Sequence, residues 1–327
     1  MRRFFEYAAS AAVCVMTALT SCQKNVVDEQ SSAEMVTLEV SVPVAETKVV
    51  SGIDESKINS CQVFVFNDSD VLEAYVNGSS SKVDVNCTLG SKTVAVLVNA
   101  PVINDVTVLD DLMTKRSSLS DNAADALVME GMCPLEIEST ENVKVEVHVT
   151  RKVAKVKLVE VATAFDIEQY RNAPFSISSV YLINVPADNS YFTESAPQVW
   201  FNKSGYDAAD DNTLIYDKVS DPMVEPSAMY FAENTFFCYP NSVDNDSFDE
   251  QWSPRNTRLV VEAVLGEQTY YYPVTLPELE QNKSYEVSLT ITRPGSYVPD
   301  AIVDKFAAEF TVVVEDWVSG GSVSEEI

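Results

Sequence analysis

The residue with the most specific chemistry in this sequence is Cys22, which follows Leu19, Thr20 and Ser21. A branched aliphatic side chain three positions before a cysteine, with small residues between them, is a lipobox. The lipoprotein signal peptidase binds such a segment and cuts before a cysteine whose thiol already carries a diacylglycerol. The motif predicts a mature chain that begins at Cys22 and bears fatty acyl chains such as palmitate.

The segment before Cys22 has the composition of a secretory signal. It opens with two arginines and continues with a mostly small and apolar run from Ala8 to Ala18. A membrane-spanning helix needs about 20 apolar residues. This run is shorter, so residues 1–21 are predicted to be a signal peptide that is removed. Residues 22–34 are polar and are predicted to be a flexible tether to the outer membrane, where each buried methylene of the lipid contributes about 0.8 kcal/mol.

The chain of 327 residues is strongly acidic, with 22 Lys and Arg against 50 Asp and Glu and a net charge of −28. Cleavage before Cys22 removes two arginines and one glutamate, which leaves 20 basic and 49 acidic residues and a net charge of −29. A surface of this sign repels phosphate backbones, so nucleic acid is excluded as a partner. Because 46% of the residues are hydrophobic, the chain can build the cores of two ordinary domains.

Four cysteines remain in the mature chain besides Cys22. They are Cys61, Cys87, Cys133 and Cys238, and no two of them form a C-x-x-C pair. The compartment outside the cytoplasm permits disulfides, so their redox state stays open at this stage. Buried free thiols on strands are the favoured interpretation.

Strand periodicity runs through almost the whole mature chain. The first strand is predicted where apolar residues stand at every second position, at Val36, Leu38, Val40 and Val42. The positions between them hold Met35, Thr37, Glu39 and Ser41, and this two-residue period is typical of a half-buried strand. Further strands are predicted at Gln62–Phe66, Thr93–Val98, Val143–Val149, Val153–Leu158, Ser176–Val185, Leu259–Leu265, Thr269–Leu276, Tyr285–Thr292 and Phe310–Val318. The two strands on either side of Gly266 are predicted to form a hairpin.

These patterns predict an all-β chain of two antiparallel β-sandwich domains in series, of transthyretin-like or immunoglobulin-like build. Only Val108–Ser118 has a helical pattern. The polar stretch Asp166–Asn172, closed by Pro174, is the predicted boundary. The N-terminal domain is therefore expected at 35–165 and the C-terminal domain at 166–327.

Short segments spread over most of the mature chain resemble those of a known family. They are Met35–Val42, Glu46–Val49, Ile58–Phe66, Arg151–Leu158, Cys238–Asn241, Tyr270–Pro273, Asn282–Tyr285, Ile291–Ser296 and Val312–Trp317. Their order and spacing, together with the lipobox, are similar to those of the Bacteroidales fimbrillins, the subunits of type V pili. The resemblance implies a structural subunit of a cell-surface fimbria that supports adhesion and has other fimbrial subunits as partners.

The resemblance also implies an assembly route. In fimbrillins a trypsin-like protease outside the cell cuts after the first strand, that strand leaves, and the C-terminal segment of another subunit takes its place. Here the predicted cut lies between Lys48 and Val49, and the released strand is the one that carries Val36 to Val42. Lysine stands where arginine is usual, so the identity of the protease stays open. The alternative is that Lys48 is an ordinary loop lysine and the first strand stays, as in an anchor subunit.

The candidate donor strand is the C-terminal segment with Phe310, Val312, Val314 and Trp317. Alternation gives it an apolar face, and a strand taken up by a neighbouring sheet is stabilised by β-augmentation. About five buried apolar side chains at roughly 1.5–3 kcal/mol each contribute on the order of 10 kcal/mol before ordering costs. The alternative is that the segment is the last core strand of its own domain.

An enzyme is not predicted. The one histidine, His148, lies on the polar face of an alternating strand, and the sequence has no nucleophile elbow, P-loop or H-E-x-x-H motif. The loop Asp244–Glu250 lacks the glycine and distal glutamate of an EF-hand, so it is predicted to be a solvated acidic loop. We therefore expect no catalytic residue, no metal site and no cofactor.

A surface glycan-binding lipoprotein of β-sandwich build is the alternative function. It rests on aromatic side chains that could stack on sugars, in Tyr270-Tyr271-Tyr272 and in Trp200-Phe201. Alternate residues of a strand face opposite sides. Tyr271 is therefore expected in the core, with Tyr270 and Tyr272 together on the other face.

Overall fold

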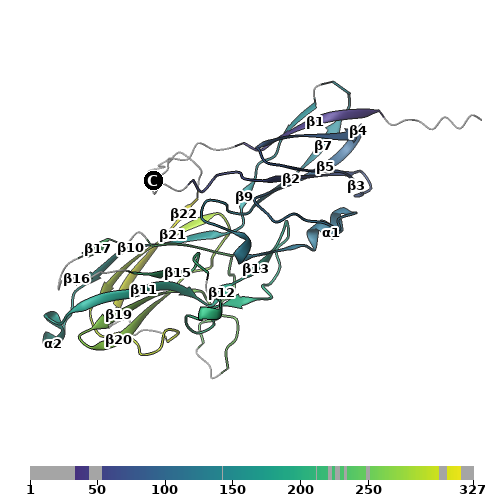
Figure 1. The fold of residues 1–327 in the computed structure, drawn as a ribbon. Helices are drawn as coiled ribbons and strands as arrows, with labels where there is room; N and C mark the ends of the chain where they lie inside the picture. Colours follow the sequence, from purple (N-terminus) through teal and green to yellow (C-terminus); the bar gives the residue numbers. More distant parts are fainter. Residues whose placement is uncertain are drawn as a thin grey trace, which may run out of the picture. The chain divides into compact units, whose positions relative to one another are not determined.

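The computed structural model describes residues 34–43, 54–141, 143–210, 212–219, 223–224, 229–231, 234–247, 251–301 and 308–317. Strands dominate this part of the chain, and they form two successive β-sandwiches that we call the N-terminal and C-terminal lobes (Figure 1). The all-β fold class predicted from the sequence is confirmed.

The N-terminal lobe is built from eight of the described strands. They are β1 (Met35–Ser41), β2 (Cys61–Asn67), β3 (Leu72–Gly78), β4 (Lys82–Thr88), β5 (Gly90–Val98), β7 (Met129–Ile137), β8 (Val143–Glu146) and β9 (Thr150–Arg151). One sheet has the order β4-β1-β8 and the other the order β3-β2-β5-β7-β9. Most neighbours are antiparallel, but β1 runs parallel to β8, which the prediction of purely antiparallel sheets did not include.

The core of the N-terminal lobe lies between these two sheets. Inward-facing residues of β1 and β4 meet those of β2 and β5, and most are valines with less than one tenth of their surface exposed. β-branched side chains suit this position because they pack well on a pleated surface. The outer face of β2 and β5 is covered too, since Phe64, Phe66 and Leu97 pack with Leu112 and Tyr191.

Leu112 comes from the short helix α1 (Leu109–Met113). The carboxylate of Asp111 accepts hydrogen bonds from the backbone N–H of Thr107 and Val108 at 2.8 and 3.1 Å, which holds the start of the helix. The helix predicted over Val108–Ser118 is therefore correct in place and too long. Its last part is strand β6 (Arg116–Ser118), which pairs with β13 (Asp188–Ser190).

Apart from β6 and β13, which pair with each other, the remaining strands of the described chain form the C-terminal lobe. They are β10 (Ala154–Thr163), β11 (Phe175–Ile183), β12 (Val185–Pro186), β14 (Trp200–Phe201), β15 (Tyr216–Lys218), β16 (Met223–Val224), β17 (Met229–Phe231), β18 (Thr235–Cys238), β19 (Arg258–Leu265), β20 (Gln268–Thr275), β21 (Lys283–Ile291) and β22 (Ala308–Asp316). A short helix, α2 (Glu168–Arg171), lies between β10 and β11, and two 3-10 turns lie at Leu119–Asp121 and Ala208–Asp210.

Two five-stranded sheets enclose the core of this lobe. One has the order β17-β10-β21-β22, with β18 also on β10, and the other the order β15-β11-β19-β20, with β16 also on β11. The hairpin β19–β20 turns at Gly266, whose φ of 65° favours glycine, and this confirms the predicted hairpin. β10 and β21 are parallel, and the ladder between them has a bulge at Leu158–Glu160.

β10 connects the lobes in sequence. It ends before the predicted boundary at 166, yet all of its strand partners lie beyond that boundary. By its hydrogen bonds β10 belongs to the C-terminal lobe, so the sheet takes chain from both sides of residue 166. Lys152 and Val153 separate β9 from β10. No helix among the described residues has the length and apolar character needed to cross a bilayer.

Candidate functional site

Strand β1 lies in the middle of its sheet. All seven of its residues pair with β4, from Met35 opposite Thr88 to Ser41 opposite Lys82, and four of them pair with β8 on the other side. The backbone N–H of Val147 extends this contact by donating to the carbonyl oxygen of Ser41 at 2.9 Å. Taking β1 out would therefore leave two unpaired strand edges facing each other.

The inward face of β1, which Val42 continues directly after the strand, is wholly apolar. Val36, Leu38, Val40 and Val42 are 2%, 0%, 1% and 3% exposed, as their alternation predicted. Full burial of such side chains contributes about 1.5–3 kcal/mol each, or about 6–12 kcal/mol for the four, as an upper bound. That range is comparable to the stability of a whole domain. An N-terminal lobe without β1 would need another strand in the same place.

The outward face of β1 is polar and makes specific contacts. The ammonium group of Lys144 on β8 lies 3.0 Å from the carboxylate of Glu39, and the hydrogen bond from Lys144 lowers the pKa of Glu39. The hydroxyl of Thr37 donates to Asn86 on β4 at 2.9 Å. These pairs join β1 to both neighbours, and they fix its register because a shift by one residue would reverse its two faces.

The predicted processing point and the lipobox lie outside the described residues. Lys48 and Val49 fall between Pro43 and Asp54, and Leu19, Thr20, Ser21 and Cys22 fall before residue 34. Cleavage and lipidation therefore stay predictions. The described chain places the predicted cut in the connection between β1 and β2, which are strands of different sheets.

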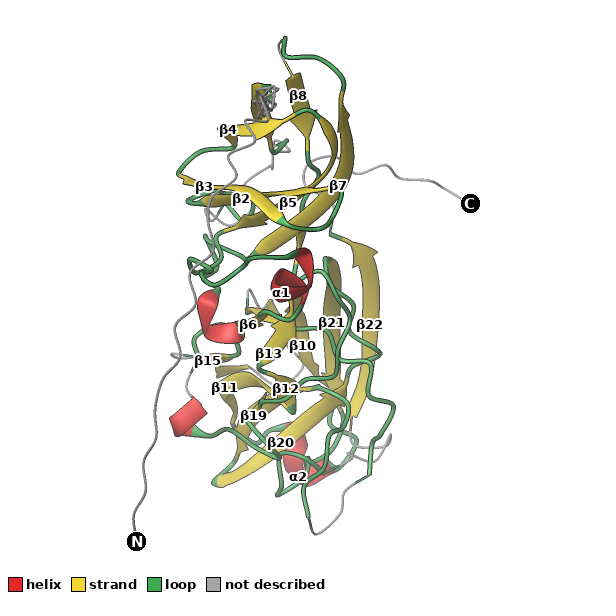
Figure 2. Cartoon of the chain, turned by 90° about the vertical axis from the view of Figure 1, so that its right-hand side faces the viewer, coloured by secondary structure: helices red, strands yellow, loops and turns green. Residues whose placement is uncertain are grey.

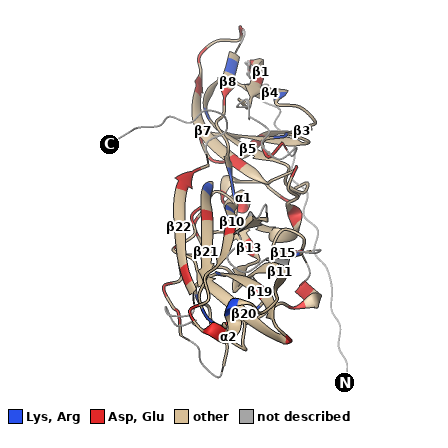
Figure 3. Ribbon diagram, turned by 90° about the vertical axis from the view of Figure 1, so that its left-hand side faces the viewer, with Lys and Arg blue, Asp and Glu red and all other residues tan. Residues whose placement is uncertain are grey.

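The candidate donor strand β22 is the edge of its sheet, paired along nine residues with β21 (Figure 2). Phe310 and Val314 are 49% and 47% exposed, and Val312 is half-buried against the core. Val312 and Val314 lie opposite Val287 and Tyr285 of β21, two core residues, so both belong to the core-side face of the sheet, but Val314 stays exposed on this edge strand. Acidic residues flank the apolar ones at both ends of β22 (Figure 3).

Trp317, directly after β22, is buried at 6% exposure. Its ring stacks on Phe237 of β18 at 5.7 Å between centroids. The guanidinium carbon of Arg151 and the ammonium group of Lys155 lie 4.5 and 4.4 Å from the ring centroid. The indole N–H donates to the carboxylate of Glu55 at 3.0 Å. The sequence predicted the apolar body of Trp317 and gave no sign of these charged partners.

The histidine and the four cysteines, whose side chains could be reactive, lie in environments typical of residues without a catalytic role. His148 is exposed, and its ring lies 3.3 Å from the carboxylate of Glu146. The four cysteines are free thiols, as favoured from the sequence. Burial raises the pKa of Cys61 to about 11 and that of Cys238 to about 12, so both are unreactive thiols at neutral pH.

The tyrosine triplet on β20 is oriented opposite to the expectation. Tyr270 and Tyr272 are 7% and 1% exposed in the main core, whereas Tyr271 faces outward against Tyr181. Alternation was predicted correctly, but it does not say which face a second sheet covers. Trp200 is buried as well, with its ring 5.6 Å from that of Trp252. The aromatic residues that suggested sugar stacking are mostly core.

A buried ionic cluster in the C-terminal lobe was not expected. The carboxylate of Asp300, 0% exposed, lies 2.9 Å from Arg255 and 2.6 Å from Arg258. Asp246 of the loop predicted to be solvated also pairs with Arg258. These residues are far apart in sequence, so no local pattern could have connected them. No group of metal-ligating side chains occurs among the residues that the structure describes.

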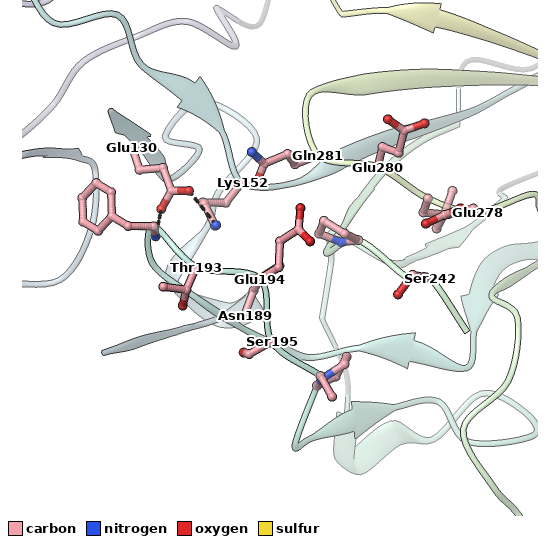
Figure 4. Close-up of a pocket in the computed structure, with 15 residues that line it drawn as sticks. Glu130, Lys152, Asn189, Thr193, Glu194, Ser195, Ser242, Glu278, Glu280 and Gln281 are labelled. Carbon is pink, nitrogen blue, oxygen red and sulfur yellow. Dashed lines mark hydrogen bonds and ion pairs between the residues drawn. The ribbon is translucent and has the colours of Figure 1, made fainter. Parts of the chain in front are cut away.

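A cavity of about 610 Å³ opens beside the buried pair of Lys152 and Glu130, whose charged atoms are 2.7 Å apart (Figure 4). Glu130 also accepts a hydrogen bond from the backbone N–H of Phe192 at 2.7 Å. The other labelled side chains are mostly acidic or amide-bearing, and several point into the cavity, such as Glu194 and Gln281. Phe192 is the one aromatic residue of its described lining.

These features define a two-lobed β-sandwich protein in which β1 is the central strand of its sheet and β22 is the edge strand of another. No family model and no curated protein sequence matches the chain. Solved structures match it over most of its length.

Three of these structures are fimbrial or adhesion proteins. A candidate cell adhesion protein from Bacteroides eggerthii has a TM-score of 0.68 at 18% identity and covers 87% of this chain and 97% of its own. A fimbrillin from Porphyromonas gingivalis has a TM-score of 0.63 at 19% identity, covering 88% of this chain and 99% of its own. The tip fimbrial protein of the same organism, solved with a C-terminal truncation, has a TM-score of 0.54 at 13% identity and covers 87% of this chain and 100% of its own.

At these identities the match establishes the fold. The chain has the fold of the Bacteroidales fimbrillins, and the resemblance seen in the sequence is confirmed as a structural match over most of the chain.

Proposed function

We propose that this protein is a structural subunit of a cell-surface fimbria that supports adhesion. It is exported as a lipoprotein, anchored in the outer membrane through Cys22, and assembled by strand exchange after a trypsin-like protease cuts at Lys48. Other fimbrial subunits, of the same or a different kind, are its partners. The fimbrillin fold supports the proposal at its coarsest level.

The observation that carries the proposal is the position of β1. The first strand of the mature chain is also the middle strand of its sheet, and it buries four apolar side chains there. A chain that loses it presents an apolar groove between two unpaired edges, β4 and β8. Such a groove binds a strand of matching pattern from another molecule.

The second support is the C-terminal strand. β22 holds an edge position and leaves Phe310, Val313 and Val314 about half exposed, so little apolar burial opposes its departure. Its even-numbered residues repeat at the same spacing as the buried residues of β1. Both features support the proposal that this segment is the donor, since an edge position favours release and the matching pattern favours a fit to the groove.

The test is the N-terminal sequence of the protein recovered from surface filaments. A start at Val49 supports processing at Lys48, whereas a start at lipidated Cys22 in filament subunits contradicts it. Labelling cells with a clickable fatty acid checks the anchor, since Cys22→Ala should remove the label. Equal label in the variant and the wild type would contradict lipidation at Cys22.

Surface glycan binding is the alternative function from the sequence. In the described part of the chain Tyr270, Tyr272 and Trp200 are core residues, so their rings do not offer a surface for a sugar. A sugar-array screen distinguishes it from the fimbrial proposal, which electron microscopy of surface filaments tests.

A further inference from the structure

The C-terminal strand is held unevenly along its length. From Phe310 to Asp316 its side chains are half-buried or exposed, and the apolar core reaches it mainly through Val312. Trp317, the next residue, is 6% exposed. Among the described residues at this end of β22, Trp317 is therefore the one deeply buried anchor.

The surroundings of Trp317 bring together segments that are distant in sequence. Its indole N–H donates to Oε2 of Glu55 at 3.0 Å, and Nζ of Lys155 lies 3.0 Å from the same oxygen. Arg151 and Lys155 both lie within 4.5 Å of the ring centroid, at a distance where cations are attracted to an indole face. Phe237 stacks on the ring as well.

The backbone of Trp317 is also fixed. Its N–H donates to the carbonyl oxygen of Asn282 at 3.1 Å, and its own carbonyl oxygen accepts from Arg151 at 3.4 Å. Arg151 further donates to the carbonyl oxygen of Glu55 at 3.2 Å. One arginine thus holds the end of the C-terminal strand and the segment of Glu55 together.

Glu55 lies at the start of the described chain that follows the predicted cut, six residues after Val49. The end of β1 is close to this place, because Val42 and Pro43 line one cavity of about 680 Å³ together with Ser56 and Trp317. The strand expected to leave, the segment after the cut and the end of the candidate donor strand therefore meet around one site.

We infer that Trp317 is a latch, by which we mean a positioning residue that holds β22 in its own sheet before assembly. It does so through its contacts with Glu55, Lys155 and Arg151. Its role in assembly rests on the proposed function. The latch keeps the donor strand from pairing with other chains until the segment after the cut is freed. All of its contacts lie within one chain, so they can be tested without assembly.

Two lysines of β10 provide a matched test. Lys155 and Lys157 are neighbours on one face of the strand, and each pairs with a glutamate, Glu55 at 3.0 Å and Glu286 at 3.8 Å. Only Lys155 lies over the Trp317 ring. Lys155→Ala therefore removes part of the latch, and Lys157→Ala removes a comparable ion pair without touching it.

The measurement is hydrogen exchange by mass spectrometry on the full-length chain purified in detergent. We expect the β22 amides to exchange about tenfold faster in Lys155→Ala, which corresponds to about 1.4 kcal/mol of opening free energy, with β19 and β20 unchanged. Trp317→Phe keeps the stacked ring and loses the N–H, so it should give a smaller acceleration in β22 alone. Lys157→Ala should exchange like the wild type.

Three results would overturn the latch. They are unchanged β22 exchange in both Lys155→Ala and Trp317→Phe, equal acceleration in Lys157→Ala, and acceleration of β19 and β20 together with β22. The last result would make Trp317 a core residue of the whole lobe. The experiment needs no filaments, so failure to form filaments would refute the fimbrial proposal without bearing on the latch.

Discussion

Replacing Phe310 by alanine separates the role of β22 in its own lobe from its role between subunits. In the single chain the Phe310 side chain is 49% exposed on an edge strand. About half of the contribution of a buried phenylalanine is available there, so the substitution should lower the free energy of unfolding by about 1 kcal/mol. For a lobe of this size that corresponds to about 2–4 °C in Tm.

In a neighbour's groove the same side chain would be enclosed. The positions that β1 fills there, such as Leu38, are 0–3% exposed. Truncation of a fully buried phenylalanine costs about 3–5 kcal/mol. The contact between subunits should therefore weaken by between about 100-fold and several thousand-fold. A small effect on folding and a large effect on assembly are expected from one substitution.

The assay pairs thermal melting of the purified chain with electron microscopy of filaments on cells that express the variant. Leu38→Ala is the matched control, because Leu38 is 0% exposed on β1 and its loss should cost about 2–5 kcal/mol of folding. If β1 is absent from mature filaments, Leu38→Ala chains that survive export should still assemble. Normal filament length with Phe310→Ala, or a fall of ten degrees in its melting temperature, would refute the donor assignment.

Three further predictions concern processing and stability. Lys48→Ala should leave full-length lipoprotein as monomers at the outer membrane, and normal filaments in that variant would contradict cleavage at this residue. Asp300→Ala should destabilise the C-terminal lobe by about 3–5 kcal/mol in denaturant melts, because buried Arg255 loses its carboxylate partner and buried Arg258 keeps only Asp246; an unchanged midpoint would show that both arginines relax to water. Burial acts to raise the pKa of Glu73, but hydrogen bonds from Lys92 and Thr88 hold it below its ordinary value of 4.5. The stability that ionised Glu73 contributes is therefore present above pH 4.5 and lost as the pH falls below it. Glu73→Gln should lower Tm at pH 7 and make Tm fall less steeply in acid. Parallel curves of Tm against pH for variant and wild type would contradict a stabilising Glu73–Lys92 pair.

The fold was largely predictable because sheet formation leaves a local trace. Alternation located β1, β5, β19, β20, β21 and β22, and the turn at Gly266 identified a hairpin. Parallel pairs were missed, since β1 and β8 are joined by hydrogen bonds across more than a hundred residues. Periodicity shows that a strand has two faces and carries no information about its direction or its neighbours.

The candidate site was predictable only in part for the same reason. The four inward residues of β1 are as buried as expected, whereas Val314 is exposed and the tyrosine triplet is reversed. The edge position of β22 exposes Val314, and for the tyrosines the deciding fact is which face of β20 the second sheet covers. The contacts of Trp317 with Glu55 and the pairing of Asp300 with Arg258 depend on tertiary structure, so a single sequence contains no signal for them.

The place of β1 also bears on the order in which the N-terminal lobe folds. β2 and β3 are neighbours in sequence and can pair early, but β1 pairs with β8, with Leu38 opposite Val143. Contacts of such long sequence separation form slowly, because a large loop must close first. We therefore expect β1 to insert last, after the rest of the lobe has folded. If β1 enters last, its removal retraces the final folding step: β4 and β8 lose their common partner, and the five-stranded sheet β3-β2-β5-β7-β9 keeps its pairing.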